Sequence, residues 1–204
     1  GNYGTVINNL NLVGYDSTAC RMLFYGSTLG TQSILNCQTV TATNVDFRDI
    51  YLSGTTDFDL SEISGGSGDC GGNSGIIFTS PQTHYFKFTT GTAYWKDNVR
   101  WYSDYERTIQ SRMPLPQDFA ILDENSFTGT STLSFYNTYR VCGFDMSKVN
   151  QTLTYSLTKT VNVFGDLIFT PNSTQTGAYG FSMSGIGNHI LTPNGFAAFT
   201  LGLQ

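Results

Sequence analysis

The sequence predicts an all-β protein, built as an antiparallel sandwich or barrel of many short strands. Three observations lead to this prediction. Only 12% of the residues are charged while 39% are hydrophobic, whereas soluble domains usually carry about 25% charged residues. Apolar and polar residues alternate along most of the chain, as they do in half-buried strands. Turns rich in glycine, proline and asparagine separate these alternating runs.

The clearest alternating run spans residues 151–163. Leu153, Tyr155 and Leu157 fall on one face, and hydroxyl side chains fall on the other. Further strands are expected, in chain order, at 5–13, 21–25, 34–40, 45–50, 76–79, 84–89, 99–102, 131–136, 139–144, 167–170, 179–183 and 196–203. Strands of this length and spacing favour a sandwich or barrel. No period of 20–50 residues repeats clearly, which argues against a solenoid or propeller.

One segment predicts a short helix, at residues 103–113. Ser103 and Glu106 have the spacing of a capping box, in which two side chains satisfy the free N–H groups of a helix start. Tyr105, Ile109 and Met113 would then share one helical stripe, and the proline that follows would end the helix.

We expect a single β-rich domain over residues 1–204, because no linker divides the chain. The sequence starts at Gly1 without a methionine, and we interpret it as a domain of a larger protein. The net charge of -5 argues against nucleic acid as a partner, which requires clustered Lys and Arg. No signal peptide is recognisable, and no apolar run approaches the roughly 18 residues of a membrane span.

The sequence predicts no cofactor and no metal site. Cys20, Cys37, Cys70 and Cys142 form no CxxC pair of the kind that zinc sites use. Two disulfides and free buried thiols both remain open for these four residues. The carboxylates within residues 57–62 lack the spacing of a calcium loop and are expected to form a solvated acidic turn.

Residues 68–72, with the sequence Gly-Asp-Cys-Gly-Gly, resemble the nucleophile loop of chymotrypsin-like viral cysteine proteases. In that family the cysteine attacks a carbonyl and nearby backbone amides bind the oxyanion. The family places its histidine before the nucleophile, but no histidine precedes Cys70 here. We therefore expect no enzyme, and keep as the alternative a cysteine peptidase or hydrolase that uses Cys70 with His84 or His189.

The densest aromatic cluster contains both tryptophans of the chain. Tyr94, Trp95, Arg100, Trp101 and Tyr102 are the residue types that dominate protein hot spots and stack on sugar rings. We predict a receptor-binding patch at these five residues. Packing in the core is the alternative interpretation, because aromatic side chains dominate cores and interfaces alike.

The chain as a whole resembles the protruding spike domain of a small non-enveloped virus capsid, most closely an astrovirus capsid spike such as an avian one. The resemblance rests on the length, the start at Gly1, the charge-poor composition rich in Thr, Ser, Asn and Gly, and the nearly strand-only pattern. It implies a homodimeric domain on the virion surface, produced in the host cytoplasm. Such a domain would bind a host-cell receptor, protein or glycan, and would be exposed to neutralising antibodies.

The first functional hypothesis is therefore a non-enzymatic surface projection that attaches to host cells without inserting into a membrane. Many copies on one particle would multiply a weak single-site affinity. The trimeric fibre head of a phage or of an adenovirus-like particle is a further alternative, although no shaft repeat precedes this domain.

Overall fold

The computed structural model describes residues 6–15, 21–196 and 202–203, and contacts group the chain into two compact units. The N-terminal unit comprises Gly1–Ser80, and the C-terminal unit comprises Pro81–Gln204. This grouping by contacts does not test whether the chain folds as one domain, so the single domain over residues 1–204 stays a prediction. The all-β prediction is confirmed, since the only helical segment in the described residues is the 3-10 turn η1 at Asn98–Arg100.

The described residues of the N-terminal unit form eight short strands, and the pairings among these strands are all parallel. They pair in the orders β1-β3-β5, β2-β4-β7 and β6-β8. Their bounds are β1 Ile7–Val13, β2 Met22–Tyr25, β3 Ser33–Thr43, β4 Val45–Arg48, β5 Ile50–Ser53, β6 Phe58–Asp59, β7 Ser67–Asp69 and β8 Ile76–Ile77. Val45, Phe47, Ile50 and Leu52 are fully buried at its centre.

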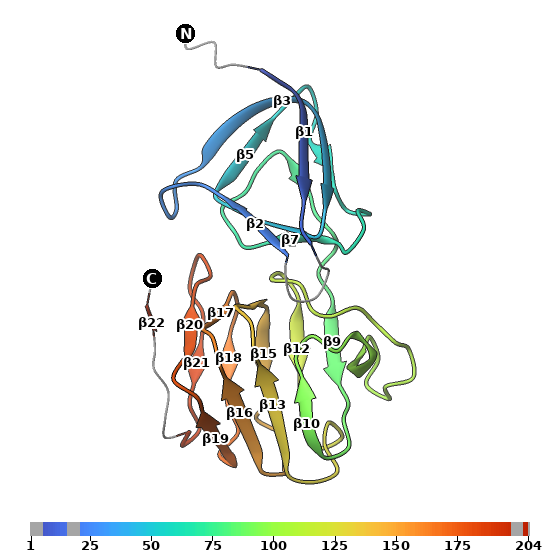
Figure 1. Ribbon diagram of the computed structural model, residues 1–204, viewed down its shortest axis with the longest axis vertical. Coiled ribbons are helices and arrows are strands. Elements are labelled where there is room, and N and C mark those ends of the chain that lie inside the picture. The colour runs from blue at the N-terminus through green and yellow to red at the C-terminus, as the bar shows by residue number, and fades with distance from the viewer. Residues whose placement is uncertain (1–5, 16–20, 197–201, 204) are drawn as a thin grey trace. The chain divides into compact units, whose positions relative to one another are not determined.

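The described residues of the C-terminal unit form three sheets, which the chain visits in turn (Figure 1). The six-stranded sheet has the order β11 (Trp101–Tyr102), β9 (Thr83–Phe86), β12 (Phe119–Ile121), β15 (Gly143–Asp145), β18 (Leu167–Ile168) and β21 (Leu191–Thr192). The second sheet has the order β10 (Gly91–Tyr94), β13 (Ser131–Phe135), β16 (Leu153–Leu157) and β19 (Ser173–Thr176). The third has the order β14 (Arg140–Val141), β17 (Val161–Val163), β20 (Phe181–Met183) and β22 (Gly202–Leu203).

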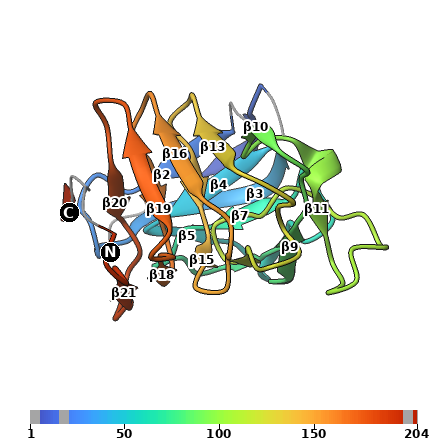
Figure 2. The ribbon, with the colours of Figure 1, turned by 90° about the horizontal axis from the view of Figure 1, so that it is seen from below.

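One passage of the chain through the three sheets forms one coil. The strands of successive coils pair in parallel, and the exception is the antiparallel pair β11–β9. Phe119 pairs with Gly143, and Leu153 pairs with Ser173. From β12 and β13 onward one coil therefore takes roughly 20 to 24 residues, a repeat length at the lower end for solenoid proteins, whereas the first coil is longer, since Phe119 pairs back to Thr83 and Ser131 to Gly91. The C-terminal unit is a β-solenoid, and β13, β16 and β19 lie side by side in coil order in Figure 2 as well.

The predicted antiparallel sandwich or barrel is wrong in the direction of strand pairing, and the argument against a solenoid is wrong too. In both arrangements side chains alternate between the interior and the solvent, so alternation alone does not reveal which strands pair. The outward Thr154 and the inward Leu153, Tyr155 and Leu157 have the faces predicted for them. Coils of unequal length and composition hide the repeat in the sequence.

The predicted helix at 103–113 is also absent, because side-chain hydrogen bonds hold this segment in an irregular loop. The Asp104 carboxylate accepts the backbone N–H groups of Thr108, at 3.0 Å, and Ile109, at 2.6 Å. Arg107 has a φ of 57°, which no residue inside an α-helix adopts. Local bonds of this kind compete with helix formation and favour a turn.

Candidate functional site

A hollow lies on the outer face of the six-stranded sheet, where neighbouring coils bring three side chains into one row. Tyr85 on β9 is in register with Ile121 on β12, and Ile121 is in register with Asp145 on β15. His84 and Phe86, which flank Tyr85 on β9, point inward and are buried. Because side chains alternate along a strand, this row faces the solvent.

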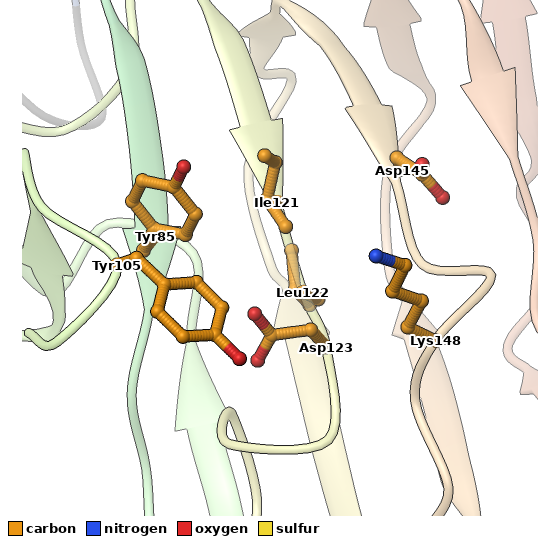
Figure 3. Close-up of a pocket in the computed structure, with 7 residues that line it drawn as sticks. All are labelled: Tyr85, Tyr105, Ile121, Leu122, Asp123, Asp145 and Lys148. Atoms are coloured by element: carbon orange, nitrogen blue, oxygen red, sulfur yellow. The ribbon is translucent and has the colours of Figure 1, made fainter.

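The hollow has a volume of about 160 Å³ and has aromatic, apolar and charged walls (Figure 3). Tyr85 and Tyr105 stand on one side, and Asp145 and Lys148 stand on the other. The remaining lining residues are Ile121, Leu122 and Asp123. The combination of aromatic faces and hydrogen-bonding groups is typical of small-molecule sites.

Arg107 fixes the two tyrosine rings in place. Its guanidinium is buried, lies 5.4 Å from the Tyr85 ring centroid and 5.5 Å from that of Tyr105, and bonds the Asp123 carboxylate. It also donates to the carbonyls of Phe86, at 3.2 Å, and of Tyr105. The rings meet edge to face at 5.9 Å. A wall held in this way loses little conformational entropy when a ligand binds.

The charged side chains of the hollow differ in how many hydrogen bonds and ion pairs they already form within the protein. Asp123 is 2% exposed and forms an ion pair with Arg107, so its role is to hold the wall. Asp145 accepts one backbone N–H, from Ser147 at 2.8 Å. Lys148 has no hydrogen-bond or ion-pair partner among the described residues. Asp145 and Lys148 therefore have free bonding capacity for a ligand.

A second, more open hollow of about 370 Å³ shares Tyr105 with the first. Lys87, Glu106, Arg107 and Asn125 complete its lining. The Asn125 amide donates to the Tyr105 hydroxyl at 3.1 Å. Tyr105, which is 48% exposed, is therefore the wall between two neighbouring recesses.

The structure divides the predicted receptor patch between core and surface. Trp95 and Trp101 are fully buried, with ring centroids 4.8 Å apart, so neither can stack on a ligand in this conformation. Tyr94 is 41% exposed, and Tyr102 is half-buried. The guanidinium of Arg100 lies 4.8 Å from the ring centroid of Phe88. For the tryptophans, the alternative interpretation of core packing is correct.

The residues of the cysteine-hydrolase alternative lie in different units. Cys70 is buried in the N-terminal unit, whose sequence contains no histidine, and His84 and His189 belong to the C-terminal unit. Cys37 and Cys142 are free buried thiols, and burial raises the pKa of both. Cys20 lies outside the described residues, so the question of disulfides stays open for it.

His84 belongs to a buried polar chain that sequence reasoning missed. Its Nε2 lies 3.1 Å from Asp118 Oδ2, and its Nδ1 lies 2.8 Å from Ser111 Oγ. Arg112 and the backbone N–H of Leu115 also donate to Asp118. Burial alone would raise the pKa of Asp118, but the hydrogen bonds from His84 and Arg112 outweigh it and lower the pKa. Asp118 is therefore a carboxylate at neutral pH.

We expect the Asp118→Asn variant to unfold more easily than the wild type at pH 7, by about 1–3 kcal/mol, because charge-assisted hydrogen bonds are lost. The lowered folded pKa means that this stabilisation is complete above the unfolded carboxyl pKa of about 3.9. The stabilisation is lost as the pH falls through the pKa that Asp118 has in the folded protein. The gap between the two proteins should therefore shrink below about pH 4. Urea unfolding between pH 7 and pH 2 measures it, and a gap that stays constant would contradict this account.

The sequence offered little signal for the hollow itself. The capping-box pattern places Tyr105 in a helix, and Asp145 and Lys148 flank a turn whose residues carry no motif. Tyr85 and Asp145 become neighbours only because consecutive coils stack, which no local pattern shows.

The described residues contain no group of three or more His, Cys, Asp or Glu side chains suited to a metal ion. In the same part of the chain, no helix is long and apolar enough to cross a membrane. No protein-family model, curated protein or solved structure matches the chain. The resemblance to a capsid spike therefore stays a prediction, and the function has to be argued from the hollow.

Proposed function

We propose that this protein is an attachment module that binds a carbohydrate in the hollow walled by Tyr85 and Tyr105. The observation that carries the proposal is the pair of tyrosine rings, held by the buried Arg107, opposite Asp145 and Lys148. The apolar face of a sugar can pack against such rings. The carboxylate can then accept its hydroxyl protons, and the ammonium can donate to its oxygens.

The charge-poor composition supports the same function. With 12% charged residues and a net charge of -5, the protein lacks the excess of Lys and Arg that nucleic acids require of a partner. Free positive and negative groups balance in the hollow, since Lys148 faces Asp145. A neutral, hydroxyl-rich ligand suits this arrangement better than a strongly anionic one.

Tyr105→Ala tests the proposal. We expect this variant to remain folded and to bind its oligosaccharide about tenfold or more weakly, because a hot-spot aromatic contributes roughly 1.4 kcal/mol or more. The measurement is an oligosaccharide array with the wild type, followed by titration calorimetry of the strongest binder with each protein.

Tyr179→Ala is the matched control, because Tyr179 is 41% exposed and lies outside the hollow. It should bind like the wild type. Equal binding by Tyr105→Ala and Tyr179→Ala would remove the hollow from the site, and a wild type that binds no oligosaccharide on the array would overturn the proposal.

We further propose the setting that the sequence resemblance implies, a homodimeric projection on a virion that attaches to host cells. A cell-binding assay with the isolated chain tests attachment, and light scattering distinguishes the dimer from the trimer of a fibre head. Attachment should be lost together with oligosaccharide binding in Tyr105→Ala.

A further inference from the structure

Ser111, His84 and Asp118 form a continuous hydrogen-bonded chain in the C-terminal unit. The distances are 2.8 Å from Ser111 Oγ to His84 Nδ1 and 3.1 Å from His84 Nε2 to Asp118 Oδ2. His84 and Asp118 are buried, while Ser111 is half-buried. The hydroxyl is therefore the end of the chain nearest the solvent, and the order hydroxyl, imidazole, carboxylate is that of a nucleophile, a base and an orienting acid.

The partner of Nε2 fixes one proton position. A carboxylate only accepts hydrogen bonds, so Nε2 carries a proton and donates it to Asp118. With the imidazole in its neutral form, which the proposal below requires, Nδ1 is an acceptor and the Ser111 hydroxyl donates to it. The two ring nitrogens are exchanged relative to the serine-protease template, but the roles are the same.

Asp118 is held rigidly enough to orient the ring. The backbone N–H of Gln82 donates to Oδ1 at 2.8 Å, and that of Leu115 donates to Oδ2 at 2.6 Å. Arg112 adds a bidentate contact. A fixed carboxylate of this kind keeps the tautomer in which Nδ1 is free to accept a proton.

A donor for a developing oxyanion lies next to the serine. Among the described residues, nothing accepts the backbone N–H of Arg112, the residue that follows Ser111. The N–H of the residue after the nucleophile is one of the two oxyanion donors in α/β-hydrolases. The backbone N–H of Arg112 is therefore free to act as such a donor for an ester carbonyl at Ser111 Oγ.

We propose that Ser111 is an activated nucleophile that cleaves small carboxylic esters, an activity separate from carbohydrate attachment. Ser111 Oγ attacks the ester carbonyl while His84 Nδ1 takes the hydroxyl proton. The bond to the alcohol oxygen then breaks, and the alcohol leaves with that proton. Water attacks the acyl-serine with the same base, which releases the carboxylic acid and restores the hydroxyl. Asp118 is a positioning residue in both steps.

A fluorophosphonate probe tests the nucleophile directly, because an activated serine displaces its fluoride and keeps the phosphonyl group. We expect the folded wild type to take up one probe molecule, which peptide mass spectrometry locates at Ser111. Ser111→Ala should take up none. Ser103→Ala is the control and should react like the wild type, because the one hydrogen-bond partner of the Ser103 hydroxyl among the described residues is the Ile109 carbonyl, at 3.5 Å, and no histidine.

Two further measurements separate catalysis from a structural role. Wild-type hydrolysis of p-nitrophenyl acetate should exceed that of Ser111→Ala, and Asp118→Asn should lower the labelling rate by up to about 10⁴-fold. The labelling rate is compared in variants whose circular dichroism matches the wild type. Either of two results overturns the proposal: a folded wild type that takes up no more probe than Ser111→Ala, or an adduct on another residue. Neither result bears on oligosaccharide binding.

Discussion

Trp101→Ala should destabilise the C-terminal unit by about 3–5 kcal/mol, the usual cost of deleting a buried aromatic side chain. Trp101 is fully buried, and its ring packs 4.8 Å from Trp95 and 4.9 Å from Phe86. Its indole N–H donates to the Trp95 carbonyl at 3.0 Å. The substitution therefore leaves a cavity and also a buried acceptor that has lost its donor. Urea unfolding followed by circular dichroism measures the loss.

Tyr94→Ala is the matched control within the same aromatic segment. Tyr94 is 41% exposed, and its ring makes one edge contact with Tyr136 at 5.6 Å. Its loss should cost no more than about 1 kcal/mol. Trp101→Ala and Tyr94→Ala with equal stability would contradict the buried position of the tryptophan.

The expected instability of Trp101→Ala also affects how a binding experiment on the predicted receptor patch is interpreted. If Trp101→Ala abolishes attachment, the loss is expected to follow from unfolding, because the ring is not available to a ligand. Attachment has to be compared at a temperature and denaturant concentration where both variants are folded. Tyr94 and Tyr102 remain the members of the predicted patch with exposed or half-buried rings.

The sequence predicted correctly those features that depend on a single strand, namely which of its side chains are buried. Alternation at Leu153, Tyr155 and Leu157 predicted which side chains are buried, and the shortage of charge predicted strands in place of helices. The direction of pairing depends on where the chain goes after each strand. Because consecutive strands enter different sheets, pairing partners are a full coil apart, beyond the reach of a local pattern.

The hollow escaped prediction for the same reason. Tyr85 and Asp145 are far apart in the sequence and share one row because their strands stack on β12. The loop that carries Tyr105 looked helical, since the capping-box pattern says nothing about a buried partner for Arg107. That partner is Asp123, and its long-range ion pair overrides the local preference.

Asp123→Ala should be at least as damaging as Trp101→Ala, by about 3–5 kcal/mol, because it leaves the Arg107 guanidinium buried without a counter-charge. The side chains of both residues are 2% exposed, so solvent screens their interaction little. The loop that holds Tyr105 against Tyr85 should loosen at the same time. We therefore expect weaker oligosaccharide binding even under conditions in which the variant is folded.

Two comparisons show whether the loss of stability in Asp123→Ala comes from the unpaired buried charge of Arg107. Asp166→Asn removes the charge of a more exposed carboxylate, which lies 3.8 Å from His189, keeps an oxygen that can accept the Ile190 N–H, and should cost no more than about 1 kcal/mol. The double variant Arg107→Met/Asp123→Leu removes both charges and should be more stable than Asp123→Ala alone, because no uncompensated charge stays buried. Urea unfolding at low and at high salt gives each value. If the double variant were the less stable of the two, the guanidinium's bonds to the Phe86 and Tyr105 carbonyls, rather than its pairing with Asp123, would hold the wall of the hollow.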